Sequence, residues 1–240
     1  MNKAVCIGVS VALVLDAAWF IRFAITKIVA TFFRSDLKSI LDESVVYSIC
    51  STQDLDFMWH MNNARYFREL DFARTDNLVR SGIYSTYRSI RSDIYVLQHA
   101  RWANNLVFNK YAIFEIDILN WYWIITCYTL FRFSTIRYRR PINFLRPFLV
   151  RTKLIWWDSK SLYFEQRFET LHDGFIRAIA FSRNTVVNAE AEEVVRKCLE
   201  NQKSDDNDIK KPELREDLKN WIEFDQSNSN FLKVERGVEF

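Results

Sequence analysis

The chain has 240 residues, of which 49% are hydrophobic and 26% are charged, and its formal net charge is +3. This length and composition suit one globular domain with appendages and exclude a disordered chain. So small a net charge gives no electrostatic reason to bind nucleic acid, and no nucleic-acid partner is expected. The four cysteines lie far apart and form no CxxC pair, so neither a disulfide framework nor a metal site is expected. No cofactor is expected either.

The N-terminal residues 4–33 read AVCIGVSVALVLDAAWFIRFAITKIVATFF. The uncharged part before Asp16 fits the core of a signal peptide, whereas residues 4–21 with Asp16 tolerated give a marginal membrane span. Lys3 alone precedes this segment, and four basic residues follow it: Arg22, Lys27, Arg34 and Lys38. The positive-inside rule therefore favours an uncleaved anchor in the endoplasmic reticulum or another endomembrane, with the body in the cytosol.

Two alternatives remain for the same segment. A cleaved signal would give a secreted protein, although bulky residues follow the small pair Ala17–Ala18 at once. A helix over residues 17–33 could instead lie on a membrane surface.

The body of the chain shows a strand pattern, one long helix, and then a run of strands. The helix is predicted over residues 61–81, with apolar residues at helical spacing and Gly82 as its stop signal. Period-two or β-rich segments predict strands at 45–51, 93–98, 148–157, 161–170 and 175–187. A short helix over 190–200, a polar linker over 201–212 and a last helix over 212–226 follow. This order predicts an α+β fold in which an antiparallel sheet wraps around a long central helix.

Residues 54–63 read DLDFMWHMNN and directly precede the predicted long helix. The end of a helix offers unpaired N–H groups that can polarise a carbonyl, and Asp56 could act on that carbonyl as base or nucleophile. His60 could orient or donate, and Asn62 and Asn63 could cap the helix or fix the loop. The plain structural alternative carries equal weight: Asp56 as a turn residue, an asparagine as helix cap, and His60 as a hydrogen-bonded buried imidazole.

The pattern DLDxxxHMNNxxY, with a long helix and an aromatic-rich antiparallel sheet after it, resembles the hotdog-fold thioesterases. Four blocks in the same order, HMNNARYFRELDFAR, IRYRRPI, TKLIWWD and HDGF, are similar to the group called thioesterase superfamily member six. The resemblance covers residues 45–98 and 134–235. It implies a hotdog fold with an N-terminal hydrophobic helix, a homodimer, and action in lipid metabolism on acyl-CoA or another acyl thioester.

The resemblance also implies roles for single residues. Asp56 matches the base or nucleophile of aspartate-type hotdog enzymes, and His60 matches the histidine that follows it. Glu69 stands where other members have a catalytic glutamate. Nine residues of helix turn by about 900°, so Glu69 would face away from His60 and serve the site of a partner subunit. We favour the alternative for Glu69, a solvated or dimer-bridging charge.

One departure from the pattern concerns activity. Acyl carrier protein thioesterases carry asparagine two residues after the aspartate, where this chain has Met58. Besides a thioesterase, the sequence therefore allows a catalytically weak or inactive, membrane-tethered hotdog protein that binds acyl groups or protein partners.

A second departure is the aromatic-rich segment 99–133, which interrupts the expected run of strands. It could be a second membrane-contacting hairpin, or intron sequence translated by error, and we favour the second because it splits the sheet. The chain thus divides into an N-terminal segment 1–35, a hotdog domain 36–200 with an atypical insertion 99–133, and a linker with helical tail 201–240.

Three arginines follow the insertion. Arg137, Arg139 and Arg140 could bind the phosphates of coenzyme A, since guanidinium groups form paired hydrogen bonds with phosphate. A solvated strand face is the alternative, which we weigh slightly higher.

Overall fold

The computed structural model describes residues 17–90, 129–202 and 210–235. Its helices are α2 (Ala17–Phe32), the 3-10 turn η1 (Thr52–Asp54), α3 (Asn63–Arg80), α6 (Ala191–Asn201) and α7 (Glu216–Glu235). Its strands are β1 (Ser44–Ile49), β2 (Thr129–Tyr138), β3 (Pro147–Trp157), β4 (Ser161–Thr170) and β5 (Ile176–Val186). Residues 83–90 are also helical.

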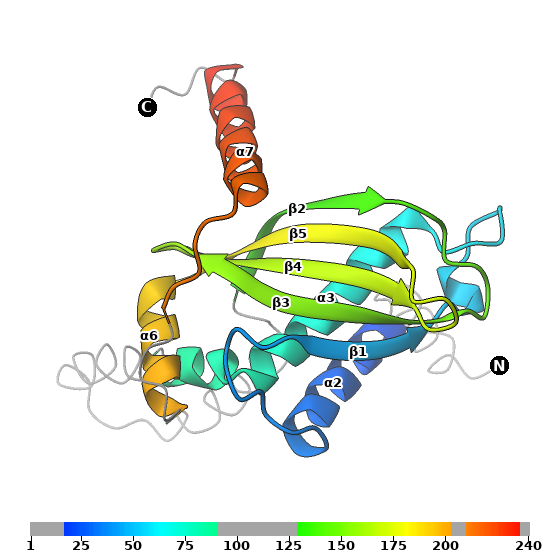
Figure 1. The fold of residues 1–240 in the computed structure, drawn as a ribbon, viewed down its shortest axis with the longest axis horizontal. Coiled ribbons are helices and arrows are strands. Elements are labelled where there is room, and N and C mark those ends of the chain that lie inside the picture. The colour runs from blue at the N-terminus through cyan, green and yellow to red at the C-terminus, as the bar shows by residue number, and fades with distance from the viewer. Residues whose placement is uncertain (1–16, 91–128, 203–209, 236–240) are drawn as a thin grey trace, which may run out of the picture.

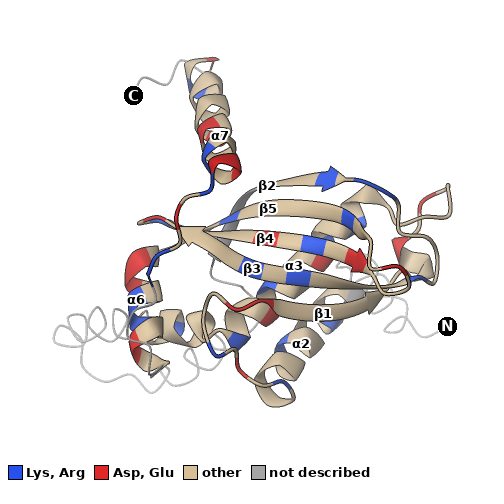
Figure 2. Cartoon of the chain, viewed as in Figure 1, with Lys and Arg blue, Asp and Glu red and all other residues tan. Residues whose placement is uncertain are grey.

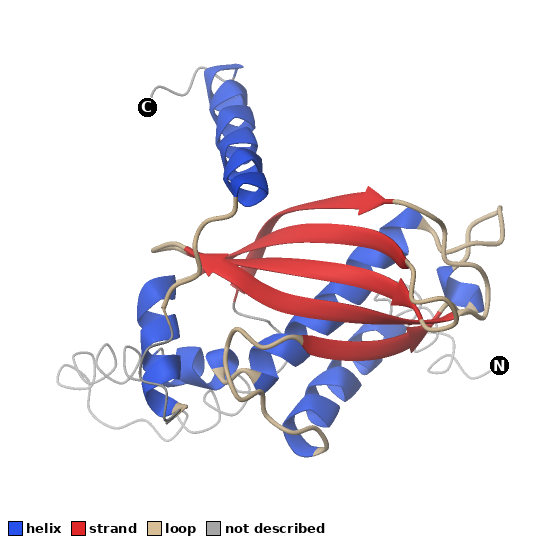
Figure 3. Cartoon of the chain, in the orientation of Figure 1, coloured by secondary structure: helices blue, strands red, loops and turns tan. Residues whose placement is uncertain are grey.

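The strands form one antiparallel sheet in the order β1-β3-β4-β5-β2, and α3 passes behind it (Figures 1 and 3). Strands β3, β4 and β5 follow one another through short turns. The first turn is closed by Asp158, whose Oδ1 accepts the N–H groups of Lys160 and Ser161, each at 2.7 Å. The predicted α+β architecture, with a sheet around one long helix, is confirmed.

Helix α3 packs on the sheet through an apolar stripe. Leu70 and Ala73 are fully buried against Phe148 and Phe168 of the sheet. A buried side-chain amide fixes the position of α3 along the sheet. Asn77 Nδ2 donates to Thr152 O of β3 at 3.2 Å and to the Ser44 hydroxyl of β1 at 3.1 Å.

Gly82 sets the position at which α3 ends. Gly82 has a φ of +76°, in the left-handed region that glycine adopts without the steric cost that other residues meet. The helix therefore ends where the sequence predicts.

Helix α2 belongs to the packed body, although the sequence places it in a separate N-terminal segment. Its Phe23 and Ala30 are buried, and its Arg22 pairs with Glu69 on α3. The outer side of α2 carries exposed apolar side chains, among them Ile21, Ile25 and Phe32. Within the described ranges, no helix combines the length and apolarity that a membrane crossing requires. Residues 4–16 of the expected anchor lie outside those ranges.

The predicted insertion 99–133 needs a corrected boundary. Strand β2 begins at Thr129, and residues 129–133 pair with β5, apart from a register shift between Phe131 and Phe133. The last part of the segment therefore continues the sheet as an edge strand. The rest of the insertion and the predicted strand 93–98 lie outside the residues that the structure describes.

The C-terminal tail crosses the outer face of the sheet. Arg215 pairs with Glu165 of β4 at 2.7 Å, Trp221 Nε1 donates to Thr135 Oγ1 of β2 at 2.7 Å, and Asp225 pairs with Arg183 of β5 at 2.9 Å. The expected terminal helix is present as α7, and it is longer than the sequence pattern indicates.

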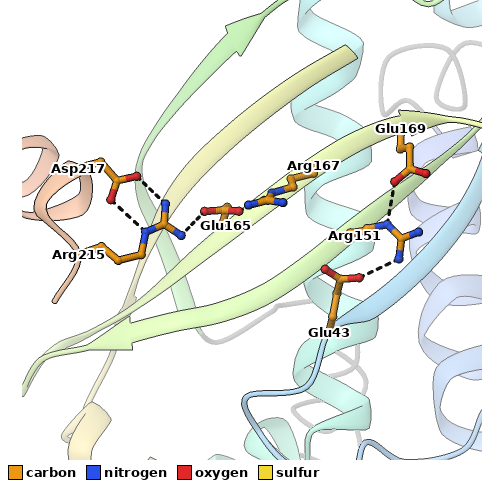
Figure 4. Close-up of polar contacts among 7 residues, drawn as sticks. All are labelled: Glu43, Arg151, Glu165, Arg167, Glu169, Arg215 and Asp217. Atoms are coloured by element: carbon orange, nitrogen blue, oxygen red, sulfur yellow. Dashed lines mark hydrogen bonds and ion pairs between the residues drawn. The ribbon is translucent and has the colours of Figure 1, made fainter. Parts of the chain in front are cut away.

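Alternating charges occupy the outer face beside this tail (Figure 2). Figure 4 shows two chains of ion pairs there, Glu43–Arg151–Glu169 and Arg167–Glu165–Arg215–Asp217. A groove of about 330 Å³ runs between β3, β4 and the segment at Pro212–Arg215. Four basic and three acidic side chains line the groove, and ion pairs join Arg151 to Glu43 and Arg215 to Glu165.

Candidate functional site

Asp56 and His60 lie in a tight loop between η1 and α3. The loop closes on itself, because Asp56 N donates to His60 O at 2.9 Å and Trp59 N donates to Asp56 O at 3.2 Å. Trp59 adopts a φ of 61°, which is unusual for a bulky residue. The connection between β2 and β3 holds the loop in place: Met61 N donates to Ile142 O at 2.8 Å.

Asp56 and His60 contact each other in this loop. Asp56 Oδ2 lies 3.1 Å from His60 Nδ1, and Asp56 Oδ1 accepts the N–H of Met58 at 2.9 Å. Both side chains are only partly exposed, at 17% and 26%. The backbone N–H of Met58 therefore fixes one carboxylate oxygen, and the other lies against the imidazole, whose Nδ1 also donates to the Met61 carbonyl oxygen at 3.4 Å. Met58 supplies a backbone N–H here, while its side chain is 62% exposed.

The two asparagines have different positions. Asn62 is the N-cap of α3, and its Oδ1 accepts the N–H of Ala64 at 2.9 Å. Asn63 is the first residue of the helix, and Tyr138 donates its hydroxyl to Asn63 O at 3.0 Å. The Asn63 N–H has no hydrogen-bond partner within the described part of the chain. It is thus the donor that this helix end leaves available beside the loop.

We expect Asn62 to stabilise α3 as its N-cap and to take no part in catalysis. Replacing Asn62 by alanine should lower the free energy of unfolding by about 1 kcal/mol, because the N–H of Ala64 loses its acceptor. Replacing it by serine, another good cap, should restore most of that loss. Urea unfolding of the three proteins measures the effect, and equal stability of the alanine and serine variants would contradict it.

Glu69 is buried, so the solvated or dimer-bridging position favoured for it is wrong. Its carboxylate is 2% exposed and forms two contacts with the Arg22 guanidinium, at 2.5 and 2.7 Å. Burial raises the pKa of Glu69, against the opposing effect of Arg22 and Ser48. Because α2 covers Glu69 within the same chain, this carboxylate is not presented to a partner subunit.

Two side chains near the loop were not assigned a role from the sequence. Tyr66, the tyrosine of the HMNNxxY pattern, is buried and accepts the N–H of Ile142 at its hydroxyl, at 3.2 Å. Cys50 is fully buried, and burial, followed by the nearby Asp54 carboxylate, raises its pKa to about 11. The thiol is therefore protonated at neutral pH, which excludes it as a ready nucleophile.

The three predicted arginines do not act as one group. Arg137 lies on β2 opposite Ile179, and its side chain is exposed. Arg139 and Arg140 follow the end of the strand and lie together against Phe175, where they meet Arg177 of β5. Sequence reasoning missed Arg177, because only strand pairing brings it to the other two.

The surface beside Asp56 and His60 is apolar. Phe57, Met58 and Trp59 are 91%, 62% and 70% exposed. The groove of about 330 Å³ lies on the outer face of the sheet, and neither Asp56 nor His60 lines it.

The sequence matches the thioesterase-like superfamily over residues 50–222, and the chain belongs to that family with a hotdog fold. Among curated proteins it is similar to two named THEM6. It is 33% identical to the protein of Drosophila melanogaster, over 92% of this chain and 93% of that relative. It is 31% identical to the protein of Xenopus laevis, over 98% of this chain and 94% of that relative.

Solved structures give a more distant comparison. The probable thioesterase YbaW of Escherichia coli is 18% identical, with a TM-score of 0.40 over 66% of this chain and 97% of YbaW. The curated relatives named THEM6, and not the solved structures, confirm the resemblance to the group called thioesterase superfamily member six.

Proposed function

We propose that this protein hydrolyses a fatty-acyl thioester, with Asp56 as base or nucleophile. The observation that carries the proposal is the contact of Asp56 with His60 just before α3, with 3.1 Å between Oδ2 and Nδ1, in a chain that belongs to a thioesterase-like family. No group in this scheme requires a metal or an organic cofactor.

In the base form of the mechanism, a water molecule attacks the thioester carbon and gives a proton to Asp56. The carbonyl oxygen becomes an oxyanion, which the available N–H of Asn63 stabilises with the positive end of the helix dipole. When the carbon–sulfur bond breaks, the proton passes from Asp56 to the leaving thiolate. The His60 imidazole, with Nδ1 3.1 Å from Asp56 Oδ2, packs against the carboxylate and holds it in place. In the nucleophile form, Asp56 attacks the carbon itself, the carbon–sulfur bond breaks, and the thiolate leaves an acyl anhydride on Asp56. Water then hydrolyses this anhydride to the free acid and the Asp56 carboxylate, and one proton of the water goes to the thiolate.

A second copy of the chain completes the site in this proposal. Three large apolar side chains beside the catalytic pair, Phe57, Met58 and Trp59, are exposed in the single chain. Adjacent apolar surface of this kind is typical of an interface. We infer that the partner subunit covers it and that the acyl chain lies between the two subunits.

The alternative is a protein that binds acyl groups or partners without turnover, and Met58 is the residue that favours it. Release of free thiol from a panel of acyl-CoA esters by the full chain distinguishes the two. We expect turnover of at least one ester, with dependence on Asp56. Retention of acyl-CoA without release of thiol, across the whole panel, would establish the binding protein instead.

We also propose that residues 4–21 tether the protein to an endomembrane with the body in the cytosol. The support is the charge distribution, since four basic residues follow the segment closely: Arg22, Lys27, Arg34 and Lys38. The protein should remain with membranes after carbonate washing, and protease added to intact microsomes should digest its body. A protected product that carbonate extracts would indicate a cleaved signal and secretion.

A further inference from the structure

Directly after β2, the chain makes a contact with β5 that has the hydrogen-bond pattern of a β-bulge. The N–H groups of Arg139 and Arg140 both donate to the carbonyl oxygen of Arg177, at 2.8 and 3.3 Å. Two residues of one strand thus oppose a single residue of the other, directly after the regular pair Tyr138–Ala178. In a regular strand Arg139 and Arg140 would point to opposite faces, whereas the bulge lets both approach the same neighbour.

That neighbour is Phe175, and three guanidinium groups surround its ring. The central carbon of Arg139 lies 4.7 Å from the ring centroid, that of Arg140 4.6 Å, and that of Arg177 5.1 Å. Each distance is within the range of a cation–π contact. The ring therefore holds in one place three cations that repel one another.

The counter-charge at this cluster is incomplete. Arg177 pairs with Asp173 at 2.5 Å, and it also donates to Thr170 Oγ1 at 2.8 Å. The Thr170 hydroxyl, with the Phe175 N–H and Arg177, holds the pKa of Asp173 down to about 2, so this carboxyl is ionised at neutral pH. Among the described residues, no carboxylate pairs with Arg139 or Arg140. Three positive charges thus face one negative charge, and Arg139 and Arg140 are exposed to solvent.

We propose that Arg139, Arg140 and Arg177 around Phe175 form a binding site for a polyvalent phosphate, and that its ligand is the nucleotide end of coenzyme A. Guanidinium groups bind phosphate oxygens in pairs, and an excess of two positive charges suits a pyrophosphate or a phosphate monoester. This inference rests on the proposed function, and it names coenzyme A as the carrier of the acyl group.

The position of the cluster agrees with such a ligand. Tyr138, directly before Arg139, donates its hydroxyl to Asn63 O at the start of α3. Ile142, two residues after Arg140, accepts the N–H of Met61 in the catalytic loop. One short segment therefore carries the arginines at one end and supports the Asp56–His60 loop at the other. The pantetheine arm of coenzyme A would join these two points.

The first experiment measures binding without hydrolysis, by calorimetry on the full chain. Adenosine 3′,5′-bisphosphate and coenzyme A should bind, whereas pantetheine should bind much more weakly. The double variant R139Q/R140Q should lose affinity for both nucleotides by about tenfold or more, because each lost guanidinium removes charge-assisted hydrogen bonds. R177K, which keeps the charge and loses the planar fork, should also weaken binding.

Arg137 provides a matched control. It is an exposed arginine of the same strand, and R137Q removes the same charge without touching the cluster. It should weaken binding clearly less than R139Q/R140Q, because the guanidinium groups over the Phe175 ring in the described part of the chain are those of Arg139, Arg140 and Arg177. An equal loss in R137Q and in a single cluster variant would overturn the site, because it would reduce the effect to overall charge.

Kinetics separate this inference from the proposed function. With acyl-CoA, R139Q/R140Q should raise KM and leave kcat unchanged, and with acyl-pantetheine it should change neither. Nucleotide binding without any hydrolysis would reject the thioesterase and keep the phosphate site. Equal kcat/KM for acyl-CoA and acyl-pantetheine would reject the phosphate site and keep the thioesterase. The phosphate site would also be overturned if R139Q/R140Q lost activity on an acylated acyl carrier protein while the wild-type chain showed no measurable binding of adenosine 3′,5′-bisphosphate.

Discussion

Replacing Asp56 by asparagine should lower kcat for acyl-thioester hydrolysis by about 10²- to 10⁴-fold, the usual contribution of a general base. Asparagine keeps the size of the side chain and can still accept the N–H of Met58, so the loop should keep its shape. It cannot take a proton from water, and it cannot form an acyl intermediate. Thiol release, measured with the acyl-CoA ester that the wild-type chain turns over fastest, gives the result.

Two further variants sharpen this test. His60→Gln should reduce kcat by less than Asp56→Asn, because His60 holds the carboxylate in place and does not itself take the proton in this scheme. Met58→Ala should change the rate little, since the contact to Asp56 comes from the backbone N–H of Met58. Thermal unfolding should be similar in all three variants. Hydrolysis by Asp56→Asn at the wild-type rate would exclude the proposed chemistry.

The catalytic loop could be predicted from sequence because its parts are neighbours in the chain. Three residues separate Asp56 from His60, and so short a segment cannot carry them far apart. The N-cap at Asn62 and the stop at Gly82 follow from local rules in the same way. The long helix and the three strands after the insertion have strong periodicity, which is the most dependable signal in a sequence.

The environment of Glu69 could not be predicted, because it depends on a contact across 47 positions of sequence. Helical periodicity places Glu69 on the face opposite His60, but it does not show that α2 returns to cover that face. The arginine cluster has the same difficulty. The alternation of a regular strand separates Arg139 from Arg140, and only the bulge opposite Arg177 brings them together.

The contact between Arg22 and Glu69 should be among the largest single contributions to stability. Replacing Arg22 by methionine should lower the free energy of unfolding by about 3 kcal/mol at neutral pH, because it leaves a buried carboxylate without its partner. This is the lower end of the range for a broken buried pair, since the Arg22 side chain is 35% exposed while Glu69 is 2% exposed. Urea unfolding measures the loss.

Arg34 supplies a matched control for this substitution. Arg34 also joins the α2 region to a buried carboxylate of α3, at 2.6 Å from Asp76. Asp76 keeps a second partner in Arg80 at 3.3 Å, so Arg34→Met should cost clearly less than Arg22→Met. The double variant Arg22→Met with Glu69→Met should recover most of the lost stability, because an apolar pair replaces the isolated charge.

The pH dependence identifies the charge as the cause. Burial raises the pKa of Glu69 in the folded chain above its ordinary value of 4.5. Between 4.5 and that raised pKa the folded state binds more protons than the unfolded state, so stability falls as pH rises through this window. Arg22 opposes the shift, and its removal extends the window to higher pH. The loss caused by Arg22→Met should therefore be small below pH 4.5, where Glu69 is neutral in both states, and should grow with rising pH. A loss that stays constant with pH would show that Arg22 contributes through its packing over Phe72, where it lies 4.5 Å from the ring centroid, and not through its charge.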